Sequence, residues 1–203
     1  MDYNEIVEQF SAKIDSVKYT DTKKSWDVSD DITIGWRNVL PDPQKNTSKR
    51  TLMELEYLAN LTKNIDGADE YLIKLVDKEP LDLFNDTLRR NNLDFDRADF
   101  KKIWNVARPV IMNLKYQYNR ARPEQIAPFF GLTINVQKTS THQTPAYPSG
   151  HTAYTAFAAY LLADMYPRFS SEFFHQVGVA GYARCVQGVH YPSDNEASMI
   201  ISG

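Results

Sequence analysis

The sequence predicts an all-α protein: a compact helical bundle whose functional site lies at helix ends in the C-terminal half. Apolar residues recur at steps of three and four from residue 48 onward, as in Leu52, Leu55 and Leu58, which is the repeat of an amphipathic helix. Alternating apolar and polar runs, which are typical of strands, are almost absent. With 203 residues and 42% hydrophobic content, residues 1–203 suit one domain with a single buried core.

The N-terminal half is expected to be helical and to carry no chemical motif. Residues 1–17 have the pattern of a short amphipathic helix, whereas 18–47 are rich in Asp, Lys, Thr and Pro and lack periodicity. We therefore expect 1–47 to form an irregular extension that packs on the rest of the domain. Further helices are expected at about 48–61, 66–75 and 81–90.

The C-terminal half, residues 95–203, is expected to form the motif-bearing core. A long helix should run from Asp96 to about Asn119, with a kink or a break at Pro109 because proline removes a helical hydrogen bond. Residues 121–148 are rich in proline and should be irregular. The remaining helices are expected at about 149–166, at 170–188 and from Pro192 onward.

Composition excludes several classes of protein. The charge balance is 23 basic against 26 acidic residues, a net charge of −3, so no overall positive field attracts nucleic acid or an anionic membrane. Cys185 is the only cysteine, which excludes an intramolecular disulfide and zinc sites built on several thiolates. The most apolar stretch, 153–165, is shorter than the ~20 residues of a membrane span. We therefore expect a soluble protein without a nucleic-acid partner.

Localisation and assembly are less constrained by the sequence. The N-terminus has no basic start followed by an apolar run, as a secretory signal requires. We expect a cytoplasmic protein if Met1 is the natural start, and a periplasmic or secreted protein if a signal was removed. Both a monomer and a homodimer are compatible with the sequence.

A first candidate segment for chemistry runs from Lys115 to Pro123. Lys115 and Arg122 are seven residues apart, about two turns of a helix, so both cations would share one face. An ammonium group and a planar guanidinium together can neutralise and orient a phosphoryl anion. The alternative is an ordinary solvated cationic helix end.

A second segment, 144–152, contains Ser149, Gly150 and His151 directly before an apolar helix. Free backbone N–H groups at a helix start attract anions. Ser149 can add a hydroxyl donor, Gly150 lets an anion approach the backbone, and His151 can give a proton to a departing oxygen. The alternative is a capped helix with an incidental histidine.

A third segment, 183–194, contains Arg184, His190 and Asp194. A carboxylate bonded to one imidazole nitrogen fixes the tautomer and leaves the other nitrogen free to attack. The alternative is a structural histidine beside a helix-capping aspartate. Because three independent segments all fit phosphoryl chemistry, together they favour one phosphoryl-transfer site.

These segments resemble the pattern of the phosphatidic acid phosphatase type 2 and vanadium haloperoxidase superfamily: Lys-x6-Arg-Pro, Pro-Ser-Gly-His and Ser-Arg-x5-His-x3-Asp, in that order. The resemblance covers about 115–203 and is closest to the soluble, bacterial-type nonspecific acid phosphatases. It implies His190 as the nucleophile, Asp194 as its partner and His151 as the general acid. It also implies a phosphate cradle, formed by Lys115, Arg122, Ser149, Gly150 and Arg184.

Two features of the match need a decision. Ala183 stands where the pattern has a serine, so a hydroxyl that could support the cradle is missing. Lys-x6-Arg-Pro also occurs twice, at 101–109 and at 115–123. We assign the second occurrence, because Arg108 lies among apolar residues inside a helix whereas Arg120 and Arg122 stand at a helix exit.

The implied activity is metal-independent hydrolysis of small soluble phosphomonoesters, of the acid phosphatase type, through a phosphohistidine. No cofactor is expected, although phosphate or vanadate could occupy the cradle; vanadate would be the cofactor of a haloperoxidase, the alternative that uses the same pocket. A catalytically silent phosphate-binding module is the alternative outside enzymes. A zinc hydrolase has the residue types but not the usual spacing; its ligands would be His142, His151, His190 and Asp194.

Several aromatic side chains could line a pocket for an aromatic or lipid ester, although such side chains more often belong to the core. They are Tyr116, Tyr118, Phe129, Phe130 and Tyr147.

Overall fold

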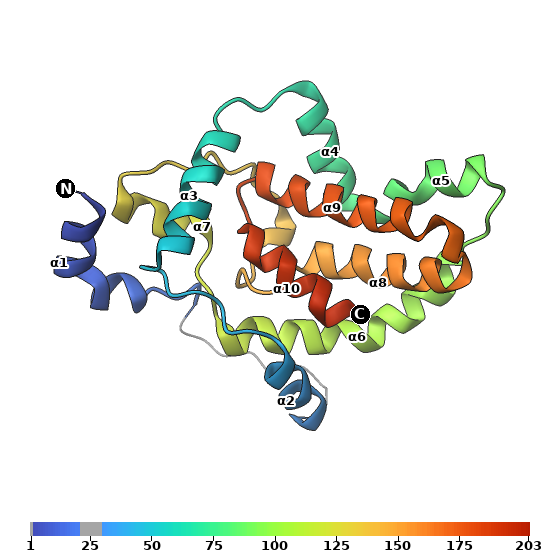
Figure 1. Ribbon diagram of the computed structural model, residues 1–203, viewed down its shortest axis with the longest axis horizontal. Helices are drawn as coiled ribbons and strands as arrows, with labels where there is room; N and C mark the ends of the chain where they lie inside the picture. The colour runs from blue at the N-terminus through green and yellow to red at the C-terminus, as the bar shows by residue number, and fades with distance from the viewer. Residues whose placement is uncertain (1, 21–29) are drawn as a thin grey trace.

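Helices make up the architecture of the described residues, 2–20 and 30–203 of a computed structural model (Figure 1), which confirms the all-α prediction. Within these ranges, the only β pairing is an isolated bridge between Lys18 and Arg120. The α-helices are α1 (Tyr3–Asp15), α2 (Asp30–Val39), α3 (Lys49–Leu61), α4 (Gly67–Lys78), α5 (Asn85–Arg90), α6 (Arg97–Tyr118), α7 (Pro123–Ile126), α8 (Gly150–Met165), α9 (Ser170–Val186) and α10 (Pro192–Ser202). Short 3₁₀ helices are η1 (Pro80–Phe84), η2 (Ala127–Phe130), η3 (Ser140–His142) and η4 (Pro167–Phe169).

Three helices begin where polar side chains can accept the free N–H groups of a first turn. Asp66 accepts two such bonds at the start of α4, at 2.8 and 2.9 Å, and Asp96 accepts two at the start of α6, at 2.8 and 3.0 Å. Ser48 accepts one at the start of α3. These caps confirm the helix starts predicted near residues 48, 66 and 96.

Helix α2 corrects the prediction that 18–47 is an irregular connection. It lies inside that segment and packs on α6, where partly buried Trp36 contacts an apolar cluster that includes Val110 and Leu114. A ten-residue helix gains most of its stability from such tertiary packing, which local periodicity does not show. Part of the predicted connection, 21–29, lies outside the described residues.

The end of α6 corrects the expected geometry of the first motif. Pro109 lies inside α6 without splitting it. The helix instead stops at Asn119, which adopts the left-handed conformation with φ of 49° that asparagine tolerates better than most residues. Lys115 and Arg122 therefore do not share a helix face; the turn after Asn119 brings Arg122 back toward Lys115.

The centre of the bundle explains why distant motifs meet. Helices α8 and α9 run side by side and are joined only by the short η4, so they are antiparallel (Figure 1). Both α10 and α6 contact α8. Alanines such as Ala156 and Ala159 are fully buried there and allow close approach of the helices. The N-terminus of α8 and the C-terminus of α9 consequently lie at the same end of the bundle.

The N-terminal segment packs on this core at one end. Ile6 and Ile14 of α1 join Leu55 and Leu58 of α3 in a cluster that also contains Tyr191, and α1, α3 and α7 gather at the same end in Figure 1. Among the described residues, we find no helix that combines the length and the apolar character needed to cross a membrane.

Candidate active site

A cavity of about 520 Å³, hereafter the site cavity, lies among α4, α6, α8 and the connection from α9 to α10. Five of the predicted site residues line it: Lys115, Arg122, Gly150, His151 and His190. Three others are buried behind its wall: Ser149, Arg184 and Asp194. The fold thus brings the three sequence segments to one place.

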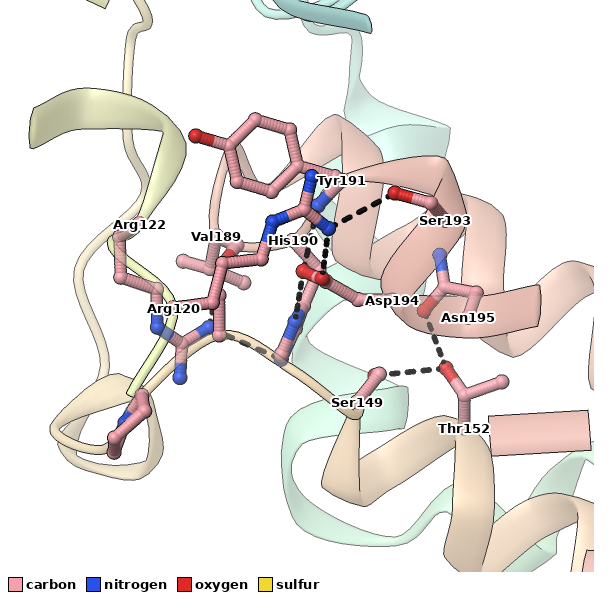
Figure 2. Close-up of polar contacts among 12 residues, drawn as sticks. Arg120, Arg122, Ser149, Thr152, Val189, His190, Tyr191, Ser193, Asp194 and Asn195 are labelled. Atoms are coloured by element: carbon pink, nitrogen blue, oxygen red, sulfur yellow. Dashed lines mark hydrogen bonds and ion pairs between the residues drawn. The ribbon is translucent and has the colours of Figure 1, made fainter. Parts of the chain in front are cut away.

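The ring of His190 lies between a carboxylate and a guanidinium. Its Nδ1 lies 3.0 Å from Oδ2 of Asp194, and its Nε2 lies 3.0 Å from Nη1 of Arg122 (Figure 2). A guanidinium can only donate, so Nε2 is the acceptor and Nδ1 carries the proton. Burial, and then the charges of Arg122 and Lys115, lower the pKa of His190 well below its ordinary value. The ring is therefore neutral, with a lone pair on Nε2.

Asp194 is itself fixed by a buried network that the sequence reasoning missed. Its Oδ1 accepts from Nη1 of Arg120 at 2.5 Å, and its Oδ2 accepts from the backbone N–H of Tyr191 at 2.9 Å. Arg120 also lies 3.4 Å from Glu54 and covers the ring of Tyr191. Glu54 in turn accepts from the N–H and the hydroxyl of Ser193, at 2.7 and 2.9 Å. Figure 2 shows Arg120 directed at both Asp194 and Ser193.

Asp77, at the end of α4, is a further residue of the site that no sequence motif indicated. It accepts from Nη1 of Arg184 at 3.2 Å and lies 4.0 Å from Nε2 of His151. Burial raises its pKa, but hydrogen bonds from Thr141 and Thr139 and the charge of Arg184 outweigh burial and lower the pKa of Asp77 overall. A carboxylate from the N-terminal half therefore stands behind the general-acid candidate and one cradle arginine.

Three buried cations face one another at the site: Lys115, Arg122 and Arg184. Burial lowers the pKa of all three groups, to about 10 for Arg122 and Arg184, and the neighbouring guanidinium adds to the effect for Lys115 and Arg122. In the described part of the chain, Nε and Nη2 of Arg184 have no hydrogen-bond partner although they are buried. A dianion would supply the missing charge and acceptors.

The three sequence segments that form this site also identify the protein family. The profile of the PAP2 superfamily matches residues 99–203, which contain all three segments. The chain belongs to the PAP2 superfamily. No curated protein matches it. Among solved structures it is similar to a transmembrane PAP2-type phosphatidylglycerolphosphate phosphatase from Bacillus subtilis, with 15% identity and a TM-score of 0.36 over 98% of this chain and 88% of that chain. Membership in the superfamily indicates a phosphatase-type function.

In this PAP2 protein, two motif positions are not directed at the site cavity. The hydroxyl of buried Ser149 lies 2.9 Å from that of Thr152, which donates to Asn195 (Figure 2). Ala183 packs in an apolar cluster with Val76. A serine at position 183 would therefore place its hydroxyl in apolar surroundings, which differs from the support for the cradle that we expected.

The structure also bears on three further expectations: the zinc alternative, the choice between the two Lys-x6-Arg-Pro matches, and the candidate aromatic residues. In the described part of the chain, no three His, Cys, Asp or Glu residues are grouped so that they could hold a metal ion. Of the four residues of the zinc alternative, His190 and Asp194 are in contact, but the four do not form such a group. Of the lysine and arginine that define each Lys-x6-Arg-Pro match, the first match places only Arg108 in the cavity lining, whereas the second places both Lys115 and Arg122 there. The five candidate aromatic residues lie outside the lining, and Trp104 and Tyr154 line the cavity instead.

The protonation of His151 leads to a first prediction. Burial and the charge of Arg184 lower the pKa of His151 to about 3, against the opposing effect of Asp77. A bound dianion raises the pKa of His151. At a pH between the pKa of His151 in the free protein and its pKa in the complex, His151 is protonated only in the complex, which therefore holds one proton more. We expect sulfate, whose charge is constant near pH 5, to bind with uptake of about one proton and with an affinity that falls as pH rises.

Calorimetry of sulfate binding in two buffers with different ionisation enthalpies measures this uptake. His151→Gln should abolish it while sulfate still binds. Unchanged proton uptake in His151→Gln would mean that another group takes the proton.

Proposed function

We propose that this PAP2 protein is a metal-independent phosphomonoesterase of the acid phosphatase type that forms a phosphohistidine on His190. The observation that supports this most is the state of His190: neutral, oriented by Asp194, and with Nε2 at the edge of a cluster of cations. A neutral imidazole is a nucleophile, and preorganised cations stabilise the charge on the phosphoryl oxygens.

The first chemical step transfers the phosphoryl group to the protein. Arg122 exchanges its contact with Nε2 of His190 for the oxygens of the substrate, which frees the lone pair. Nε2 then forms a bond to phosphorus as the bond from phosphorus to the leaving oxygen breaks, and protonated His151 gives its proton to that oxygen. Asp194 stabilises the positive charge that develops on the ring of His190.

The second step returns the protein to its starting state. Neutral His151 accepts a proton from a water molecule, whose oxygen attacks phosphorus as the bond to Nε2 of His190 breaks. Inorganic phosphate leaves, and His151 then releases its proton to solvent, because its pKa in the free protein is about 3; the next dianionic substrate restores that proton when it binds. The low pKa of His151 in the free protein means that the negative charge of the substrate is what makes it an acid.

The proposal is tested by trapping the intermediate. A labelled phosphomonoester, quenched in alkali where phosphohistidine is stable, should label the wild type and leave His190→Ala unlabelled. Phosphate binding without labelling or turnover would favour the silent binding module. Vanadate should inhibit; vanadate-dependent oxidation of bromide by peroxide without ester hydrolysis would favour the haloperoxidase.

The buried cations also predict how the activity depends on metals. Lys115, Arg122 and Arg184 can supply the charge stabilisation that a divalent ion supplies in metal-dependent phosphatases. Ester hydrolysis should therefore keep its rate after exhaustive treatment with EDTA and removal of the chelator. A loss of activity that added Mg²⁺ or Zn²⁺ restores would contradict this part of the proposal.

A further inference from the structure

We propose that the site cavity selects phosphomonoesters whose leaving oxygen carries an aromatic ring. The inference rests on the proposed function, because it assigns the part of the same cavity that holds the leaving group.

The lining of the site cavity extends well beyond what a phosphoryl group can touch. Its volume of about 520 Å³ falls within the range of pockets that enclose whole small molecules. Apart from the cradle, the lining includes six apolar or aromatic side chains: Pro80, Leu81, Trp104, Ile111, Met112 and Tyr154.

Two helices give the cavity a direction. On α6, Trp104 lies eleven residues before Lys115, which is roughly 16 Å along the helix axis. On α8, Gly150 is close to the Lys115 side chain, since a β-carbon on Gly150 would lie 3.7 Å from Cε. Tyr154, one turn further along α8, contacts Trp104 in an edge-to-face arrangement with ring centroids 4.9 Å apart. The cavity therefore has a cationic end and an aromatic end.

His151 follows Gly150 and precedes Tyr154 on α8 and lines the same cavity, and its proposed role decides which part of a substrate lies where. A general acid must reach the leaving oxygen, so the leaving group extends past His151, away from the cations. Tyr154 is three residues after His151 on the same helix face. The leaving group is thereby directed at Tyr154 and Trp104.

The aromatic end is built to contact a ring. Trp104 and Tyr154 are only partly buried, and each is supported from behind by another ring: Phe157 contacts Trp104 and Phe100 contacts Tyr154. Aromatic rings favour edge-to-face or offset contacts with a further ring. A polyol leaving group would instead turn hydroxyls toward apolar side chains, where they lose hydrogen bonds to water.

Charged side chains that also line the cavity do not alter this assignment. Apart from Asp77, which is paired with Arg184, they are Lys78, Glu79 and Arg108. All three are exposed, so water screens them, and they include both signs of charge.

The test uses phosphonates, which cannot be hydrolysed and so report binding alone. By calorimetry, the wild type should bind benzylphosphonate at least about tenfold more tightly than methylphosphonate, and more tightly than heptylphosphonate, which has the same number of carbon atoms. Trp104→Ala should remove most of the benzyl preference and leave methylphosphonate affinity unchanged. Trp104→Phe should keep the preference, and so should Ile103→Ala, a control at an exposed position on the same helix.

Equal affinity for benzylphosphonate and methylphosphonate would overturn the inference, and so would heptylphosphonate binding as tightly as benzylphosphonate, which would indicate an alkyl or lipid substrate. The proposed activity and the aromatic preference can be refuted independently of each other. Phosphonate binding with a benzyl preference but no ester hydrolysis would refute the proposed activity alone, whereas hydrolysis without a benzyl preference would refute the aromatic assignment alone.

Discussion

His190→Ala is expected to lower kcat for ester hydrolysis at least about 10⁴-fold, as removal of a nucleophile does in other enzymes with a covalent intermediate. The substitution removes the only atom in the proposed mechanism that bonds to phosphorus. Asp194 should stay in place, because Arg120 and the N–H of Tyr191 still bind it. Steady-state kinetics with calorimetry of phosphate binding would show lost turnover beside retained binding.

A matched control separates chemistry from a general effect of losing a histidine. His175 is exposed on α9 and does not line the site cavity, so His175→Ala should retain the activity of the wild type. If His190→Ala kept more than about a hundredth of wild-type kcat, which is far above the expected residual rate, His190 could not be the nucleophile.

Arg120→Met is expected to destabilise the protein by about 3–5 kcal/mol, because it leaves buried carboxylates without their cation. Asp194 is 0% exposed and Glu54 is 7% exposed, and Arg120 contacts both. Methionine fills a similar volume, so lost charge pairing dominates the effect. The free energy of unfolding in urea measures the loss.

Exposed Arg89 provides the matched comparison. It lies 3.3 Å from Asp86, and their side chains are 83% and 63% exposed, so Arg89→Met should cost less than about 1 kcal/mol. Adding Glu54→Gln to Arg120→Met should restore part of the stability, because one of the two uncompensated carboxylates becomes neutral. Equal losses for Arg120→Met and Arg89→Met would show that the buried network contributes nothing special.

Local patterns were sufficient to predict much of this protein. The steps of three and four between apolar residues predicted the helical class and the start of three helices near Ser48, Asp66 and Asp96, where the structure shows side-chain caps. These signals act within a few residues of chain, so they can be read without knowing the fold. The motif segments were likewise recognisable from residue type and spacing, and the PAP2 profile matches the part of the chain that contains them.

The partners that hold the motif residues came only from tertiary contacts. Glu54 and Arg120 are 66 residues apart in sequence, and Asp77 and Arg184 are 107 apart. The first motif shows the same limit: Lys115 and Arg122 come together through the left-handed turn at Asn119 and not through a shared helix face.

By itself, the sequence determined the helical class, the main helix starts and the chemical types available at the site. Only the tertiary structure decided that Trp36 stabilises α2, that the hydroxyl of Ser149 is bound by Thr152, and that Trp104 and Tyr154 line the site cavity. The physical reason is the range of the interactions. Helix caps and apolar repeats are satisfied by near neighbours, whereas burial, ion pairing and the lining of a cavity depend on residues far apart in the chain.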